Sequence, residues 1–293
     1  MKARKSNILV LGANGFVGRA LAKKLLQDKN TVSLVSRDKK HRVAGAKMFH
    51  GDLTDPNFCK KILRGVEVVY YLASFKKNVA IHTRQPFDVV YENVLPLLTF
   101  LWATKTSAIK TLIYASSVNV KYAVSNNRET DGYVLGKYIN ELILKSFIAQ
   151  TGIDVKIIRS SAVYGPGNDF NPEVANVIPL LIVKASYSGG KLVLRGKGKR
   201  KLQFIYIDDL VDNLIAIKNS CESFFVIGNN EAISVKDLAS RIIKLVGKNV
   251  KIITGVTQED KSTKLDIFNN VVRPKTNLDS GLRKTVAYYK TTI

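Results

Sequence analysis

Residues 8–18 read ILVLGANGFVG and decide the fold, because four apolar residues run directly into a glycine-rich turn. The apolar run predicts a buried strand, and the helical spacing of apolar residues over positions 16–27 predicts a helix after the turn. Glycine at positions 12, 15 and 18 allows a tight turn, a close approach of pyrophosphate to the backbone, and close packing of helix on strand. The N–H groups of the helix N-terminus would face the phosphates. The order of strand, turn and helix therefore predicts a dinucleotide-binding site.

The alternation of apolar strands and amphipathic helices continues over the first two thirds of the chain. Strands that are apolar on both faces are typical of a parallel sheet covered by helices on both sides. We therefore expect an α/β fold with a Rossmann-type, doubly wound parallel sheet. The further predicted strands are residues 31–35, 47–50, 66–72, 111–115 and 155–159, and the further helices are residues 87–105, which Pro96 would bend, and 133–150.

The pattern changes after Tyr164, where glycine-containing breaks at residues 165–167 and 196–198 interrupt the chain. Shorter strands and helices follow, and we expect them to form a smaller C-terminal α/β lobe that binds the substrate. The predicted dinucleotide-binding domain comprises residues 1–164 and 204–228, and the predicted substrate-binding lobe comprises residues 165–203 and 229–293. The predicted strands of this part are residues 191–194, 204–207, 224–227 and 250–253, and the predicted helices are residues 174–187, 208–218, 234–246 and 280–289.

The composition is that of a globular protein with an unusual charge, since 46% of the 293 residues are hydrophobic and the net charge is +23. A positive field attracts anionic ligands, but the lysines are scattered without interleaved aromatic residues, so we expect a solvated surface and no nucleic-acid partner. No apolar run approaches the ~18 residues that cross a bilayer, so no integral membrane segment is expected. Two cysteines suit a cytoplasmic location, and three histidines without ligand spacing predict no metal site.

The end of the second predicted strand carries the residues that would distinguish the two nicotinamide dinucleotides. An acid directly after this strand would bind the adenosine ribose of NAD, whereas Ser36 and Arg37 suit the 2′-phosphate of NADP. These residues favour NADP, with NAD as the alternative because Asp38 could still bind a ribose hydroxyl. Asp52 and Leu53, after the third strand, are placed to border the adenine.

Tyr133 and Lys137 are one helical turn apart and therefore share a face of the predicted helix. Ser116 and Ser117 follow the fifth strand, at the sheet edge where open α/β folds bind ligands. The pKa of a tyrosine is ordinarily ~10, and we expect the Lys137 ammonium and the cationic nicotinamide to lower it by favouring the phenolate. Ser117 would hydrogen-bond the substrate oxygen while Tyr133 transfers a proton.

These motifs, in this order, resemble the extended short-chain dehydrogenase/reductases, a family of NAD(P)-dependent nucleotide-sugar epimerases, dehydratases and reductases. The resemblance covers almost the whole chain. By analogy, Ser117 takes the place of the family's catalytic Ser/Thr, Tyr133 is the acid/base and Lys137 is its partner. The other segments that carry the resemblance are YLAS at 71–74, Asn93, YASS at 114–117, RSSAVYGPG at 159–167, FIYIDD at 204–209 and PKTNLDSGLRKT at 274–285.

The resemblance also assigns residues to the cofactor and to the substrate, and it implies a homodimer formed by the helices over residues 87–105 and 133–150. The residues expected to bind the cofactor are Gly12, Asn14, Gly15, Phe16, Val17, Gly18, Ser36, Arg37, Asp52, Leu53, Leu72, Ala73, Ser74, Asn93, Ala115, Ser116, Tyr133 and Lys137. The residues expected to bind the substrate are Lys76, Ser117, Asn168, Arg200 and Lys201.

Two departures from the family pattern lie near the predicted catalytic residues. Sixteen positions separate Ser117 from Tyr133, fewer than the family usually has, so we expect a shortened loop over the nicotinamide. Val118 and Asn119 stand where the 4,6-dehydratases carry an acidic pair, which argues against dehydration.

A third departure concerns the substrate. Leu202 stands where many family members have an arginine that grips the nucleotide diphosphate, so Arg200 or Lys201 would have to supply that charge. The leading interpretation is an NAD(P)-dependent oxidoreductase or epimerase that acts on a nucleotide sugar through a keto intermediate, and the NADP-like turn favours an NADPH-dependent ketosugar reductase. The alternatives are an NADPH-dependent reductase of a non-sugar carbonyl, which Leu202 would suit, and a non-catalytic cofactor-binding sensor or assembly protein.

Overall fold

The apolar run near the start of the chain forms strand β1 (Asn7–Leu11), which lies between β4 (Val68–Tyr71) and β2 (Thr31–Ser36) in a seven-stranded sheet. The strand order is β10-β6-β5-β4-β1-β2-β3, and the pairs β1–β2, β1–β4, β2–β3 and β4–β5 are parallel. The order of the strands reverses between β1 and β4, which is where open α/β sheets bind ligands. The predicted Rossmann-type α/β fold is confirmed. The remaining strands of this sheet are β3 (Lys47–His50), β5 (Thr111–Ser117), β6 (Asp154–Ser160) and β10 (Phe224–Ile227).

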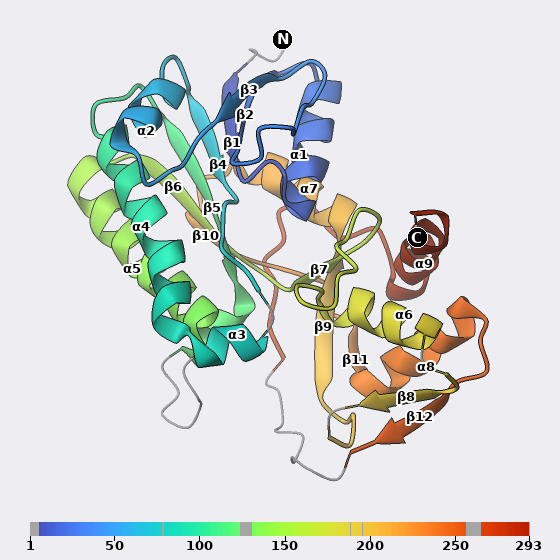
Figure 1. Cartoon of the computed structure of the whole chain (residues 1–293). Coiled ribbons are helices and arrows are strands. Elements are labelled where there is room, and N and C mark those ends of the chain that lie inside the picture. Colours follow the sequence, from blue (N-terminus) through green and yellow to red (C-terminus); the bar gives the residue numbers. More distant parts are fainter. Residues whose placement is uncertain are drawn as a thin grey trace. The chain divides into compact units, whose positions relative to one another are not determined.

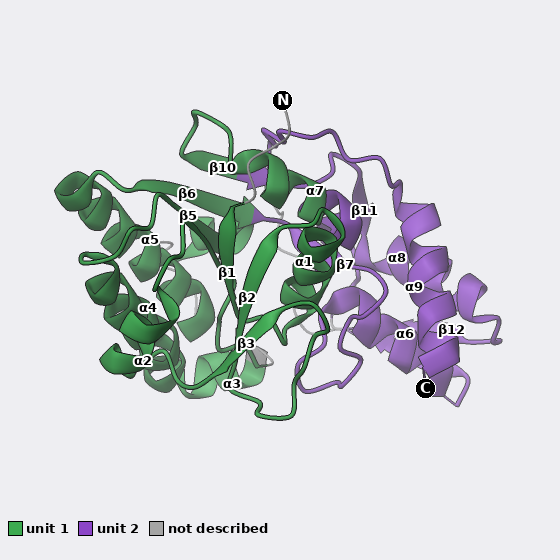
Figure 2. Ribbon diagram, turned by 90° about the horizontal axis from the view of Figure 1, so that it is seen from above, with its two compact units in different colours: residues 1–159, 211–225 green, residues 160–210, 226–293 purple. Residues whose placement is uncertain are grey.

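The computed structural model describes residues 6–77, 79–123, 131–187, 189–194, 196–255 and 265–292. The chain divides into two compact units (Figure 2), of which the first comprises residues 1–159 and 211–225 and the second residues 160–210 and 226–293. Within the described residues, no helix is long and apolar enough to cross a bilayer, and no cluster of three or more potential metal ligands occurs.

Helices cover both faces of the seven-stranded sheet (Figure 1). α4 (Pro86–Thr104) and α5 (Gly132–Thr151) pack side by side on one face, and α1 (Phe16–Gln27) lies on the other. Pro96 lies inside α4, and the helix continues through it. The large side chains that fill the core of this unit are fully buried, and they include Leu9, Tyr71, Phe100, Tyr114 and Leu144.

Short elements that we did not predict connect the long ones. They have seven residues or fewer, so no periodic pattern could be recognised in them. η1 directly follows Ser117, so the predicted loop toward Tyr133 begins with a helical turn, while residues 124–130 lie outside the described part. The short elements of the first unit are α2 (Pro56–Ile62), α3 (Val79–Arg84) and the 3-10 helix η1 (Val118–Tyr122).

The second unit contains two small sheets. β9 (Lys201–Tyr206) pairs in parallel with β7 (Ala162–Tyr164) and antiparallel with β11 (Ala232–Ser234). A separate parallel pair joins β8 (Lys191–Leu194) to β12 (Lys251–Thr254). The helices are α6 (Val177–Tyr187), α8 (Val235–Val246) and α9 (Leu278–Thr292), and α7 (Ile207–Ile217) crosses the division between the units.

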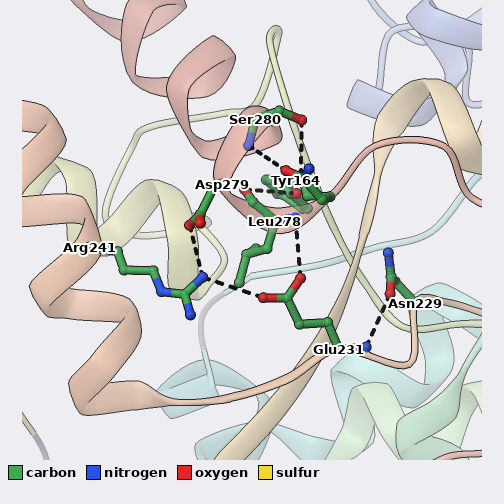
Figure 3. A network of polar contacts seen from close by, with 8 residues as sticks. Tyr164, Asn229, Glu231, Arg241, Leu278, Asp279 and Ser280 are labelled. Carbon is green, nitrogen blue, oxygen red and sulfur yellow. Dashed lines mark hydrogen bonds and ion pairs between the residues drawn. The ribbon is translucent and has the colours of Figure 1, made fainter.

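Arg241, on α8, connects the elements of the second unit (Figure 3). Its Nη1 atom lies 2.8 Å from Asp279 on α9 and 3.4 Å from Glu231, the residue before β11. The other carboxylate oxygen of Glu231 accepts a hydrogen bond from the Leu278 N–H at 3.4 Å. Ser234 is the N-cap of α8, because its hydroxyl oxygen accepts a hydrogen bond from the Asp237 N–H at 3.0 Å. These contacts fix both helices to the three-stranded sheet.

Candidate active site

The glycine turn between β1 and α1 can hold a pyrophosphate. Gly12 has a φ of +81°, and a Cβ at this position would lie 2.7 Å from the backbone nitrogen of Ala73. A Cβ on Gly18 would collide with the carbonyl oxygen of Gly12. Gly15 is the N-cap of α1 and has no side chain to occupy the first N–H groups of the helix, so these can bind phosphate. The adjoining residues predicted to bind the cofactor are Asn14, in the turn, and Phe16 and Val17, in the first turn of α1.

At the end of β2, Ser36 forms a hydrogen bond within the chain and Arg37 is exposed. The Ser36 hydroxyl, in a residue that is 5% exposed, accepts a hydrogen bond from the Asp38 N–H at 3.1 Å. The Asp38 carboxylate in turn accepts one from the Lys40 N–H at 2.8 Å. Both hydrogen bonds shape the turn, and Arg37 is exposed, as are the three residues that follow it.

Asp52 and Leu53 form the neighbouring turn after β3. The Asp52 Oδ1 atom accepts hydrogen bonds from both the N–H and the hydroxyl of Thr54 at 2.9 Å. The hydrogen bond from the Thr54 N–H lowers the pKa of Asp52, and burial acts in the opposite direction. The positive charge of Arg37 lowers this pKa further. Leu53 is buried. Arg37 and Asp52 are therefore close enough to interact electrostatically, at the place predicted for the adenosine end of a dinucleotide.

Asn93, on α4, holds the segment that follows β4. Its Oδ1 atom accepts hydrogen bonds from the Ser74 hydroxyl at 2.7 Å and the Phe75 N–H at 3.0 Å. Its Nδ2 atom donates to the carbonyl oxygens of Phe75 at 2.9 Å and Val89 at 2.7 Å. The buried Asn93 side chain thus fixes this segment, and a direct contact of Asn93 with the cofactor stays a prediction. Leu72 and Ala73, also predicted to contact the cofactor, begin the same segment.

Lys137 is buried, with 3% of its surface exposed. Its Nζ atom donates a hydrogen bond to the Ala115 carbonyl oxygen at 2.7 Å and lies 5.9 Å from the centre of the Tyr133 ring. Burial lowers the pKa of Lys137 to about 7, although the charge of Glu141 partly raises it. Ammonium and neutral amine are therefore both populated near neutral pH.

Tyr133 lies near the start of α5. Asp131 caps this helix by accepting hydrogen bonds from the N–H groups of Tyr133 at 2.9 Å and Val134 at 3.1 Å. Burial raises the pKa of Tyr133 to about 12, and a hydrogen bond with the Ser74 hydroxyl opposes this only in part. The expectation of a lowered tyrosine pKa is therefore wrong for the chain alone. Loss of water around the phenol is the main cause of the raised pKa, and the negative charge of Asp131 adds to it. Burial also disfavours the charged form of Lys137, the cation that was expected to lower the pKa of Tyr133.

Ser117 is the last residue of β5 and the N-cap of η1. Its hydroxyl oxygen accepts a hydrogen bond from the Asn119 N–H at 3.2 Å, so its proton can be donated to another acceptor. α5 packs against both β5 and η1. The structure thus brings Ser117, Tyr133 and Lys137 to the same end of β5.

Ser116 belongs to a buried network that we did not predict. Its hydroxyl donates a hydrogen bond to Glu141 at 2.5 Å, and Glu141 also accepts hydrogen bonds from Arg159 at 2.9 and 2.5 Å. Glu141 is four residues after Lys137, so helical spacing was a signal that could have placed it on the same face. The Ser116 hydroxyl is engaged within the chain, and a contact with the cofactor stays a prediction.

Two other residues near Tyr133 were also missed. Asp131 directly precedes the helix and has the residue type that favours an N-cap, which was a usable signal. His82, in α3, is buried and stacks on the Tyr133 ring. No sequence signal connects His82 with Tyr133 or Asp131, because both are about fifty residues further along the chain.

The residues predicted to bind the substrate are divided between the units. Lys76, after β4 in the first unit, is exposed. In the second unit, the Asn168 Oδ1 atom accepts a hydrogen bond from the Gly165 N–H at 3.1 Å. Arg200 and Lys201 are both exposed at the start of β9. The second unit therefore presents two adjacent cations.

Comparisons with known proteins find relatives along the whole chain. Residues 8–228 match the sequence profile of the NAD dependent epimerase/dehydratase family. A putative UDP-glucose 4-epimerase from Methanocaldococcus jannaschii is 28% identical over 306 residues, which cover 97% of this chain and 98% of the relative.

Solved structures share the fold. UDP-glucose 4-epimerase from Thermotoga maritima, in a structure with UDP-glucose, superposes with a TM-score of 0.86 at 23% identity, over 98% of this chain and 99% of that chain. UDP-glucose 4-epimerase from Thermus thermophilus, in a complex with NAD, has a TM-score of 0.83 at 19% identity, over 98% and 99% of the two chains.

The matched segment contains the glycine turn and the three residues at the end of β5 and the start of α5 that the sequence marked as catalytic. The resemblance drawn from these motifs is confirmed, and the chain belongs to the NAD-dependent epimerase/dehydratase family.

Proposed function

We propose that the protein acts on a nucleotide sugar, at a ring carbon and through a keto intermediate, as an NADPH-dependent ketosugar reductase. The observation that carries the proposal is the position of Lys137. Its buried Nζ atom hydrogen-bonds the Ala115 carbonyl at 2.7 Å and lies 5.9 Å from the Tyr133 ring centre. A buried cation beside a tyrosine, at the ligand-binding edge of the sheet, suits proton transfer at neutral pH.

The first unit would hold the cofactor. The turn at residues 12–18 fits the pyrophosphate, since its glycines leave the N–H groups of α1 uncovered. We propose that the segments around residues 36–37, 52–53, 72–74 and 115–116 complete the site, together with Tyr133 and Lys137. When bound, the dinucleotide supplies the hydride that is transferred to the sugar carbon.

The residues of the chain supply the proton and hold the substrate. In the reductive direction, the Tyr133 hydroxyl would give its proton to the oxygen of the substrate carbonyl. The Ser117 hydroxyl would donate a hydrogen bond to the same oxygen, because its own oxygen already accepts the Asn119 N–H. Lys137, in its ammonium form, would stabilise the Tyr133 phenolate that remains.

We propose NADP as the preferred cofactor. β2 ends in Ser36, where an acid would favour NAD, and the exposed Arg37 can reach a 2′-phosphate. The Asp38 carboxylate, which could serve a ribose, already accepts the Lys40 N–H. NAD is the alternative, because the Thermus thermophilus relative was solved with NAD.

We propose that the second unit is the substrate-binding lobe and that Arg200 or Lys201 binds the nucleotide diphosphate. Both side chains are exposed and cationic at the start of β9, next to the position where Leu202 replaces an arginine. Asn168 in the same unit and Lys76 in the first unit are the other proposed contacts. Leu202 also supports the second candidate function, the reduction of a non-sugar carbonyl.

We further propose a homodimer formed through α4 and α5. α4 exposes large apolar side chains at spacings of four, seven and four residues, which place them on one face of the helix. A large exposed apolar surface marks a site of association. The molecular mass in solution, from sedimentation, tests the dimer. The exposed residues are Phe87, Tyr91, Leu98 and Trp102 on α4, and Leu142 on α5.

A panel of substrates tests the proposed reaction. The purified protein is incubated with NADPH or NADH and a series of nucleotide sugars and nucleotide ketosugars, and the nicotinamide absorbance and product masses are followed. We expect NADPH to be consumed with a nucleotide ketosugar, and we expect Tyr133→Phe to slow that consumption about 100-fold. Interconversion of sugars without net consumption of the cofactor would establish an epimerase. Reduction of simple ketones alone would establish the non-sugar alternative, and cofactor binding without any turnover would establish a sensor.

A further inference from the structure

His82 is a buried side chain that no part of the proposed mechanism uses. It lies on the short helix α3, and 3% of its surface is exposed. Its ring stacks on the ring of Tyr133, with a distance of 5.3 Å between the ring centres and an angle of 14° between the planes. This stack joins two segments that are distant in sequence.

Both ring nitrogens of His82 have partners. The Nε2 atom accepts a hydrogen bond from the Lys77 N–H at 3.1 Å. The Nδ1 atom lies 3.5 Å from the Asp131 carboxylate. Since Nε2 acts as an acceptor, the ring proton belongs on Nδ1, where it can be donated to Asp131. These contacts assign one neutral tautomer and one orientation of the ring.

Asp131 links this ring to the helix that carries Tyr133. The same carboxylate accepts hydrogen bonds from the N–H groups of Tyr133 at 2.9 Å and Val134 at 3.1 Å, in the first turn of α5. His82 therefore contacts Tyr133 twice, directly through the ring and indirectly through the cap of α5.

Lys77 links the ring to the segment after β4. Asn93 holds one end of this segment at Ser74 and Phe75, and His82 holds the other end at Lys77. The segment carries the Ser74 hydroxyl, which hydrogen-bonds Tyr133. Displacement of His82 would therefore free one face of the Tyr133 ring and the Lys77 end of the segment that carries Ser74, while Asn93 still holds the other end.

We propose that His82 is a positioning residue for proton transfer, which it supports by fixing the Tyr133 ring and the segment of Ser74 in one arrangement. The proposal rests on the proposed role of Tyr133 as acid/base. A displacement of ~1 Å at a reacting group lowers a rate by up to about 100-fold, so the loss of a stacking partner and two polar contacts is expected to act mainly on kcat.

The kinetic test compares three substitutions. His82→Ala should lower kcat between about 10-fold and 100-fold and leave KM for substrate and cofactor within about twofold. His82→Phe keeps the stack but not the polar contacts, so its kcat should lie between those of the wild type and His82→Ala. Arg84→Ala, on the exposed face of the same helix, is the control and should match the wild type.

A second readout needs neither substrate nor cofactor. The chain has three histidines, so the ring signals of His82 in a nitrogen-15 histidine spectrum are assigned by their loss in His82→Gln. We expect an Nδ1-protonated neutral ring whose carbon-bound protons are shifted by the ring current of Tyr133. Tyr133→Phe should retain that shift and Tyr133→Leu should abolish it, while Asp131→Asn should change the Nδ1 signal.

The outcomes separate this proposal from the proposed function. If Tyr133→Phe is inactive while His82→Ala and His82→Phe both keep kcat within about twofold of the wild type, His82 is not a positioning residue, although Tyr133 remains the acid/base. If Tyr133→Phe is active, the proposed function itself fails. If His82→Ala does not fold, His82→Phe is the deciding variant. Phenylalanine lacks both polar contacts of the histidine ring, so a wild-type kcat in His82→Phe would overturn the proposal.

Discussion

Replacement of Lys137 by methionine keeps most of the side-chain volume and removes a charge that burial disfavours. The pKa of Lys137 is about 7 in the folded protein, against an ordinary value of 10.5. At pH 7 this difference corresponds to a loss of about 4 kcal/mol in the free energy of unfolding. Methionine leaves the Ala115 carbonyl oxygen without this hydrogen-bond donor, which costs the variant about 2 kcal/mol. We therefore expect Lys137→Met to be more stable than the wild type by about 2 kcal/mol at pH 7, and to be inactive.

The stability gain should depend on pH in one direction. Between about pH 7 and pH 10.5 the unfolded chain binds more protons at Lys137 than the folded chain does, so the contribution of this group to wild-type stability rises with pH. The variant lacks the group, and its advantage should therefore shrink by about 2 kcal/mol between about pH 7 and about pH 9. Urea unfolding followed by far-ultraviolet circular dichroism measures both values.

Lys156 provides a matched control in the same unit. It is 2% exposed, but its ammonium lies 2.7 Å from the Asp154 carboxylate and 2.7 Å from the Ser220 carbonyl oxygen. Lys156→Met should therefore destabilise the protein, because the ion pair and the hydrogen bond are lost. The loss should be only about 1–2 kcal/mol, because the Asp154 carboxylate is partly exposed and can regain water. If Lys137→Met is no more stable than the wild type at neutral pH, or if its advantage does not change with pH, the lowered lysine pKa is refuted.

The other predictions concern single contacts. Tyr133→Phe should lower kcat about 100-fold with a nearly unchanged cofactor Kd, since only the proton-transferring hydroxyl is lost; steady-state kinetics and cofactor titration check this. Arg37→Ala should weaken NADP binding about tenfold and leave NAD binding nearly unchanged in calorimetric titration, and equal weakening would make Arg37 structural. Arg200→Ala, or alanine at position 201, should raise KM for the nucleotide sugar without lowering kcat. Glu141→Gln should lower the free energy of unfolding by about 3 kcal/mol in urea, because the Arg159 charge loses its buried partner.

The sheet and the glycine turn were predictable because their signals are local. Four consecutive apolar residues formed β1, and the positive φ of Gly12 is the conformation that its residue type allows. Most other strands and helices were also found from their periodicity. The elements that were missed, such as α3 and η1, are too short to show a period, and tertiary contacts decide their conformation.

The site was predictable where helical or strand spacing brings residues together. Tyr133 and Lys137 share a helical face, and the same spacing extends to Glu141, although we did not extend it. His82 could not be found in this way, because its stack on Tyr133 depends on how a separate segment folds back. The direction of the Tyr133 pKa was also beyond the sequence, since the extent of burial around a phenol is a property of the packed unit.

The distribution of buried charge in the first unit bears on function. Arg159 pairs with Glu141, and Lys156 pairs with Asp154, so each buried charge of these pairs is offset by an opposite one. Lys137 differs from both. Its ammonium donates a hydrogen bond to a backbone carbonyl oxygen, and among the residues that the structure describes it forms no ion pair. Burial without a paired carboxylate costs stability that methionine would restore, so packing alone does not explain a lysine there. A lysine with a pKa near 7, in contact with the strand end that carries Ser117 and beside the Tyr133 ring, instead supports the proposal that this site transfers protons.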